Sequence, residues 1–61
     1  MNPSTSTAIR EINATISESG ESITAAHQII AFIDDHQAVT DLEGVDYGDV
    51  QAALLDEHLS A

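Results

Sequence analysis

Apolar residues recur at helical spacing over the first half of the chain. Ile9, Ile12 and Ile16 lie three or four residues apart, which places their side chains on one face of a helix. A second apolar stripe follows a polar segment and consists of Ile23, Ala26, Ile29, Ile30 and Ile33, with Phe32 beside it. The pattern predicts two helices, over about 6–18 and 22–36.

The last part of the chain has the pattern of a third helix. Asp46 has the residue type of an N-cap, and Asp49 follows in the first turn, where a negative charge is favourable. The apolar stripe behind them consists of Val50, Ala53, Leu54 and Leu59. Tyr47 is expected at the edge of this stripe, with its hydroxyl group in water. We therefore expect an all-α fold whose last helix spans about 46–59.

The segment between the first two stripes leaves two connections open. Gly20 lies among serine and glutamate residues, which are poor helix formers as a group. Ser22 is then expected to cap a second helix, which gives a helical hairpin or a small bundle. The alternative is one continuous helix over 6–36 that pairs as a coiled coil, because an isoleucine repeat keeps a seven-residue spacing across the segment. This repeat consists of Ile9, Ile16, Ile23 and Ile30. Gly20 inside a helix costs about 1 kcal/mol, so we prefer the hairpin.

The chain is short for a self-sufficient fold. Its 61 residues make one domain at most, spanning 1–61, with a small core. Cysteine is absent, which excludes disulfides and thiolate metal sites. Because association is another way to stabilise a small scaffold, we expect a homodimer or a tight complex with a partner. The residues expected to form the core or the dimer seam are Ile9, Ile12, Ile16, Ile23, Ile30 and Ile33. Residues 1–5 are expected to be flexible.

The net charge constrains the possible binding partners more than any sequence motif does. Eleven Asp and Glu residues accompany a single basic residue, Arg10, and the net charge is −10. Such a surface repels nucleic acids and anionic membranes and attracts basic protein surfaces. The absence of lysine and the content of Asp, Glu, Ala and Thr also resemble those of haloarchaeal proteins, which work in molar salt. The acidic surface is therefore an ordinary solvated surface that favours solubility, a contact face for a basic partner or an adaptation to salt.

Residues 39–54 resemble a helix-turn-helix motif. Gly44 is followed by Val45, and Val50 lies six positions after the glycine, as in the turn and second helix of that motif. The positions before the turn depart from the motif at Thr40, Leu42 and Glu43. The resemblance implies a DNA-binding regulator, in which Lys and Arg residues near the second helix hold phosphates. No basic residue follows Arg10, so we expect no direct binding to nucleic acid at ordinary salt.

The remaining chemistry-bearing residues form no recognisable site. The three histidines, His27, His36 and His58, lack the spacing of a zinc motif and are expected to be partly exposed helix residues. No serine has the surroundings of a catalytic nucleophile. We therefore expect no enzyme, no metal and no cofactor. No stretch approaches the roughly 20 apolar residues that cross a bilayer, and the N-terminus lacks a basic signal segment. The chain is predicted to be cytoplasmic and to bind no membrane.

Two functional hypotheses remain. The first is a small acidic protein-binding module, an inhibitor or adaptor that docks on a basic or nucleic-acid-binding protein by mimicking nucleic acid. Its predicted contact face consists of Asp41, Glu43, Asp46, Asp49, Asp56 and Glu57. The alternative is a dimeric transcriptional regulator of a halophile, with a degenerate helix-turn-helix at 39–54 and the isoleucine seam as its dimer contact.

Overall fold

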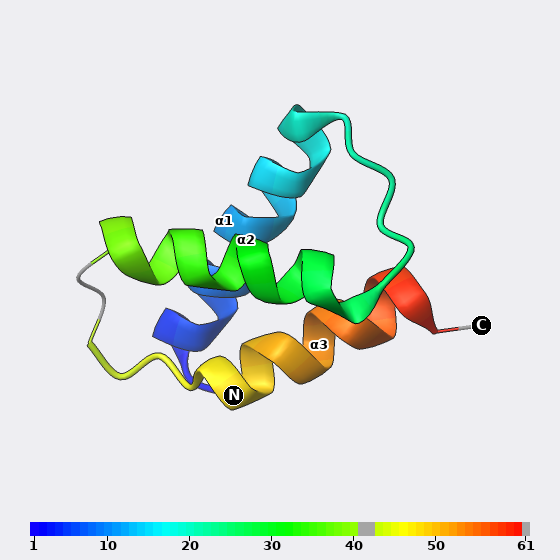
Figure 1. The fold of residues 1–61 in the computed structure, drawn as a ribbon. Helices are drawn as coiled ribbons and strands as arrows, with labels where there is room; N and C mark the ends of the chain where they lie inside the picture. Colours follow the sequence, from blue (N-terminus) through cyan, green and yellow to red (C-terminus); the bar gives the residue numbers. More distant parts are fainter. Residues whose placement is uncertain (41–42, 61) are drawn as a thin grey trace.

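Three helices make up the part of the chain that the structure describes. The computed structural model describes residues 1–40 and 43–60, and residues 41, 42 and 61 lie outside the described part. The helices are α1 (Pro3–Ser19), α2 (Ala26–Val39) and α3 (Tyr47–Leu59) (Figure 1). Within the described part there is no strand, and no helix is long and apolar enough to span a membrane. The prediction of an all-α fold of up to three helices is confirmed.

Helix α1 begins three residues before its predicted start, because Asn2 caps it. The Asn2 Oδ1 accepts a hydrogen bond from the Thr5 backbone N–H at 2.8 Å, and Pro3 occupies a position where a backbone N–H has no helical partner. The Asn2 Nδ2 donates to the Gly44 carbonyl at 2.8 Å, and the Thr5 Oγ1 accepts from the Asp46 N–H at 3.0 Å. This first turn, for which we expected flexibility, joins α1 to the segment before α3.

A left-handed glycine ends α1 and divides the isoleucine-rich region into two helices. Gly20 has φ +72°, and its N–H donates to the Ser17 carbonyl at 3.4 Å. Glycine adopts this conformation without the steric cost that a Cβ atom brings. Ile23 consequently lies in the segment that connects the two helices. The seven-residue isoleucine repeat therefore spans the non-helical connection between α1 and α2. The continuous helix over 6–36 is not formed.

Helix α2 begins four residues after its predicted start. The backbone N–H groups just before it are bound by the side chain of Gln28, and its cap is not Ser22 as predicted. The Gln28 Oε1 accepts hydrogen bonds from the backbone N–H groups of Thr24 at 2.7 Å and Ala25 at 2.9 Å. The Gln28 Nε2 donates to the Ser22 carbonyl at 3.1 Å. Ala25 occupies the N-cap position and has no side-chain acceptor. One glutamine side chain therefore holds the connecting segment against the helix.

Helix α3 begins where the sequence predicts, because Asp46 caps it. The Asp46 Oδ1 accepts hydrogen bonds from the backbone N–H groups of Gly48 at 3.0 Å and Asp49 at 3.2 Å. These donors lie in the first turn, where helix N–H groups lack partners within the helix. In the turn before α3, Gly44 has φ +81°, a second left-handed position.

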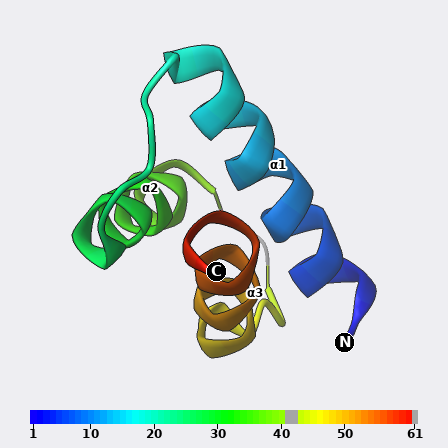
Figure 2. The same ribbon diagram turned by 90° about the vertical axis from the view of Figure 1, so that its right-hand side faces the viewer.

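The three helices pack against one another as a small bundle. Helices α2 and α3 run side by side in opposite directions, and α1 crosses them (Figures 1 and 2). Each pair of helices is in contact. The buried core consists of Ala8, Ile12, Ile16, Ile29, Ile33, Val50 and Leu54. It is lined further by partly buried residues at Ile9, Ile23, Phe32, Val45, Tyr47 and Leu55.

The residues of the predicted seam occupy three different environments. Ile12, Ile16 and Ile33 are buried, and Ile9 and Ile23 are partly buried against the core. Ile30 is 41% exposed, whereas its neighbour Ile29 is fully buried. A rotation of about 100° per residue separates these two side chains around α2, so only one of them can face the other helices. The dimer itself stays a prediction.

Candidate functional site

All the described carboxylates lie on the surface. The ten acidic residues within 1–40 and 43–60 are all exposed. Arg10 is exposed as well, and its Nη2 donates to the Thr7 Oγ1 at 3.3 Å. Within the described residues, the single ion-pair contact joins Glu11 to His36. The surface therefore carries a negative charge that no arginine or lysine of this part of the chain neutralises.

Part of the predicted contact face lies along α3. Asp49 and Asp56 are exposed and seven residues apart, which places them on one side of the helix, about 10 Å apart along its axis. Glu43 is exposed in the turn before α3. Asp41 lies outside the described residues. Helix α3 therefore presents a row of carboxylates that nothing in the described structure covers.

Two other residues of the predicted face also hold the fold. Asp46 caps α3, as described above. The Glu57 Oε2 accepts a hydrogen bond from the Asn13 Nδ2 at 2.8 Å, and the His58 Nε2 lies 2.8 Å from the Asn13 Oδ1. An amide oxygen only accepts hydrogen bonds, so the His58 Nε2 is the donor. Asn13 thus connects α1 to the end of α3, and a change at Glu57 affects this contact as well as the surface charge.

His36 forms a hydrogen-bonded junction of all three helices. Its side chain is buried, its Nδ1 lies 3.1 Å from the Tyr47 hydroxyl, and its Nε2 lies 3.2 Å from the Glu11 Oε2. The Tyr47 and His36 rings are 6.0 Å apart between centroids and tilted by 60°. A neutral imidazole satisfies both contacts when Nε2 donates to Glu11 and Nδ1 accepts from Tyr47.

The junction corrects two expectations from the sequence. His36 is buried, not partly exposed, and the Tyr47 hydroxyl binds His36 within the protein. The reason is packing: α1 and α3 both close over the end of α2, so a polar side chain there needs partners from its neighbours. His27 is exposed and His58 is partly exposed, as expected. Within the described residues, every buried side-chain nitrogen and oxygen has a hydrogen-bond partner.

Two adjoining cavities form a groove along α2, which we call the α1–α2 groove. The smaller cavity, of about 190 Å³, has a largely apolar floor and is lined by Ile12, Thr15, Phe32, Asp35, His36 and Val39. The larger, of about 420 Å³, is lined by Glu21, His27, Gln28, Ala31, Phe32 and Asp35. The two cavities share Phe32 and Asp35, so they adjoin each other along α2.

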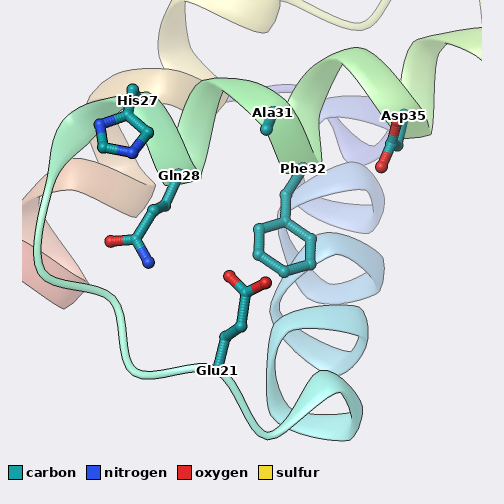
Figure 3. A pocket seen from close by; sticks show the side chains of 6 residues that line it. All are labelled: Glu21, His27, Gln28, Ala31, Phe32 and Asp35. Carbon is teal, nitrogen blue, oxygen red and sulfur yellow. The ribbon is translucent and has the colours of Figure 1, made fainter.

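The two carboxylates that line the larger cavity come from different segments. Glu21 reaches from the connecting segment toward the ring of Phe32, and Asp35 lies farther along α2 (Figure 3). His27 and Gln28 lie at the opposite end. Phe32 is partly buried, so one part of its ring packs on the core and the rest is accessible in the groove. The larger cavity therefore combines an accessible aromatic ring with polar and negatively charged side chains.

Sequence reasoning missed this groove, although one signal for it was present. Phe32 and Val39 are apolar, lie seven residues apart on α2 and fall outside the line of buried isoleucines. Val39 is 84% exposed. A second apolar line on a helix indicates a second contact surface.

Comparison with known proteins adds no constraint. No protein-family model, no curated protein sequence and no solved structure matches the chain. No three His, Asp or Glu side chains of residues 1–40 and 43–60 are close enough together to hold a metal ion. The function is therefore inferred from surface charge and shape alone.

Proposed function

We propose that this chain is a small acidic module that binds a basic protein, as an inhibitor or an adaptor. The single observation that supports the proposal is the exposure of all ten described carboxylates, none of which contacts an arginine or lysine. A surface of this kind attracts a positively charged partner and accelerates its association. Binding of this kind needs no catalytic residue and no cofactor.

A nucleic-acid-binding protein is the partner class that this surface suits best. Such proteins present Lys and Arg residues spaced to hold the phosphates of a nucleic acid. Asp49 and Asp56 offer two carboxylates on one side of α3, and Glu43 extends the negative surface into the preceding turn. Carboxylates placed in this way compete with phosphates for the same basic side chains. The module would therefore inhibit nucleic-acid binding by its partner.

The test is affinity capture followed by a measured affinity. The full chain is immobilised at about 0.1 M KCl, where charges about 10 Å apart still interact. Each captured protein is then purified, and its affinity is measured against salt and against a nucleic-acid competitor. We expect a basic partner whose affinity falls steeply with salt and which nucleic acid displaces. Absence of any basic partner under these conditions would refute the proposal.

A matched pair of variants separates charge from fold. Asp49→Asn with Asp56→Asn removes two negative charges from side chains that make no hydrogen bond within the described residues. Ala14→Gln, at an exposed position of α1 outside the predicted contact face, changes the surface without changing its charge. Loss of affinity in the double variant, with unchanged affinity in the control, supports a charge-driven contact through α3.

The alternative function is a dimeric transcriptional regulator with a degenerate helix-turn-helix at 39–54. It is favoured by Gly44, whose φ of +81° suits the turn, and by Val45 and Val50, which pack into the core as the motif requires. It is disfavoured by the exposed residues at the start of α3, which include Asp49 and no basic side chain. Among the described residues before Gly44 in this segment, only Val39 belongs to a helix, whereas the motif needs a short first helix there. Retardation of its own upstream DNA in molar KCl would support the regulator.

A further inference from the structure

The smaller cavity of the α1–α2 groove has a largely apolar floor that no residue described in the structure covers. Val39 is 84% exposed at one end of the smaller cavity, and Phe32 separates this cavity from the larger one. Ile12 lies beneath them on α1. Exposed aliphatic and aromatic side chains that line one concave surface are typical of a site where another molecule docks.

The edges of this groove are acidic on both sides. Asp35 lines both cavities from α2, and Glu21 lines the larger one from the connecting segment. On α1, Thr15 lines the smaller cavity, and Glu11 and Glu18 lie one turn to either side of it on the same helix face. All four carboxylates are exposed. Arg10, the basic residue of the chain, is not among the lining residues of either cavity.

The negative charge beside the α1–α2 groove indicates which kind of molecule binds there. A second copy of this chain would bring a net charge of −10 against a surface of the same sign. A neutral apolar segment would leave the carboxylates without partners. A segment with apolar residues on one side and Lys or Arg residues on the other can pack on the apolar side chains of the groove and pair with the carboxylates beside it.

The spacing of the apolar side chains indicates the form of that segment. Phe32 and Val39 are seven residues apart on α2, about 10 Å along its axis. Two apolar side chains of another helix are separated by the same distance when they lie seven residues apart. Grooves between helices bind amphipathic helices through apolar anchors at this spacing.

We propose that the α1–α2 groove binds an amphipathic basic helix of the partner protein. The proposal rests on the proposed function and places the apolar part of the contact on α2 and α1, away from the carboxylate row of α3. Apolar anchors at i and i+7 of the bound helix lie against Val39 and Phe32. Its basic residues lie beside Asp35 of α2 on one side and beside Glu18 and Glu21, at and after the end of α1, on the other.

The test is a titration of the full chain, followed by the backbone amide signals in nuclear magnetic resonance. The probe is a synthetic peptide of leucine and lysine, with leucines at i, i+3, i+4 and i+7 so that it forms an amphipathic helix. A peptide of the same composition with its leucines scattered around the helix serves as control. We expect the amphipathic peptide to shift the amides of Thr15, Ala31 and Val39 and to bind at least tenfold more tightly than the control. The amides of Ala52 and Gly48 on α3 should shift little.

A matched pair of variants tests the apolar floor. Val39→Ser removes an exposed apolar side chain inside the groove, and Ile30→Ser removes one on another face of the same helix. Because Val39 is 84% exposed, the variant should keep the helix content of the wild type. We expect Val39→Ser to weaken peptide binding about five- to tenfold and Ile30→Ser to change it less than twofold.

The outcomes separate the groove from the proposed function. If the peptide shifts the amides of α3 instead, or if both serine variants bind equally, the groove is not the docking site, although a basic ligand still binds. If the scattered peptide binds as tightly as the amphipathic one, the contact is charge alone and the groove proposal is wrong. If neither peptide binds at about 0.1 M KCl, where surface charges are only partly screened, the groove proposal is overturned, and affinity capture then decides the proposed function.

Discussion

The neighbours Ile29 and Ile30 offer the sharpest test of the fold. They have the same side chain and belong to the same helix, but Ile29 is fully buried and Ile30 is 41% exposed. Replacing either residue with alanine raises helix propensity by the same few tenths of a kcal/mol. The difference between the two variants therefore reports burial alone.

The expected losses of stability differ severalfold. Ile29→Ala removes methyl groups that contact the core and leaves a cavity among the three helices, at an expected cost of about 3 kcal/mol. Ile30→Ala removes methyl groups that are already partly in water, at a cost of about 0.5 kcal/mol after the gain in helix propensity. A domain of this length has a total stability of roughly 3–9 kcal/mol, so Ile29→Ala consumes much of it.

Urea denaturation followed by far-ultraviolet circular dichroism measures both losses. With a slope of about 1 kcal/mol per molar urea, Ile29→Ala should lower the midpoint by about 3 M and Ile30→Ala by less than 1 M. Equal losses, or a larger loss for Ile30→Ala, would refute the orientation of α2. The predicted homodimer is tested in the same series. If Ile30 lies in a dimer seam, the loss of stability caused by Ile30→Ala grows with protein concentration. Sedimentation equilibrium should then give a lower average mass for the variant than for the wild type.

Four further predictions concern the contacts between helices, the helix ends and the charge. Tyr47→Phe removes the hydroxyl that contacts the His36 Nδ1, and a thermal melt should show a loss of about 1 kcal/mol; an unchanged melting temperature would show that this contact is not formed in solution. Asp46→Ala removes the cap of α3 and should cost about 1 kcal/mol in urea, and Asp46→Asn should restore most of it. Gly20→Ala places a Cβ on a left-handed residue, where it meets no atom within 4 Å, so the expected cost of about 1 kcal/mol is backbone strain alone. Raising KCl from about 0.1 M to 1 M should raise the melting temperature by screening repulsion among the carboxylates, and a fall would contradict an uncompensated surface.

The helices could be predicted from the sequence because their signals are local. The three-to-four-residue spacing of isoleucines, the break at Gly20 and the cap at Asp46 all act within a turn or two of the chain. The start of α1 also had a local signal, because Asn2 is an N-cap residue type followed by Pro3, but the prediction did not use it. The start of α2 could not be predicted in this way, because Ala25 at the N-cap has no side-chain acceptor and the Gln28 side chain binds the backbone there.

The contacts between side chains of different helices could not be predicted from the spacing of residues in the sequence. Glu11 and His36 are 25 residues apart, and Tyr47 is a further 11 residues away, so no local spacing indicates their contact. The apolar stripe of α2 contains both Ile29 and Ile30, and the choice between them depends on how α1 and α3 approach. The acidic character of the surface was predictable from composition, but the α1–α2 groove requires the juxtaposition of Thr15 with Phe32 and Val39.

Some carboxylates make hydrogen bonds within the fold, and the side chains of others make none. Variants of the second kind can therefore separate an effect on partner binding from an effect on stability. Glu11, Asp46 and Glu57 accept or share hydrogen bonds that join or cap helices, so their removal changes stability. The side chains of Asp49 and Asp56 make no hydrogen bond within the described residues and lie on the surface. If the negative charge served only to keep the fold stable in concentrated salt, amides at these two positions would change stability and salt response but no affinity. If the charge serves a partner, Asp56→Asn, near the C-terminus of α3 where a negative charge is unfavourable, should slightly stabilise the fold while it weakens binding. Opposite signs of the two effects would therefore assign this carboxylate to a partner rather than to the folded state itself.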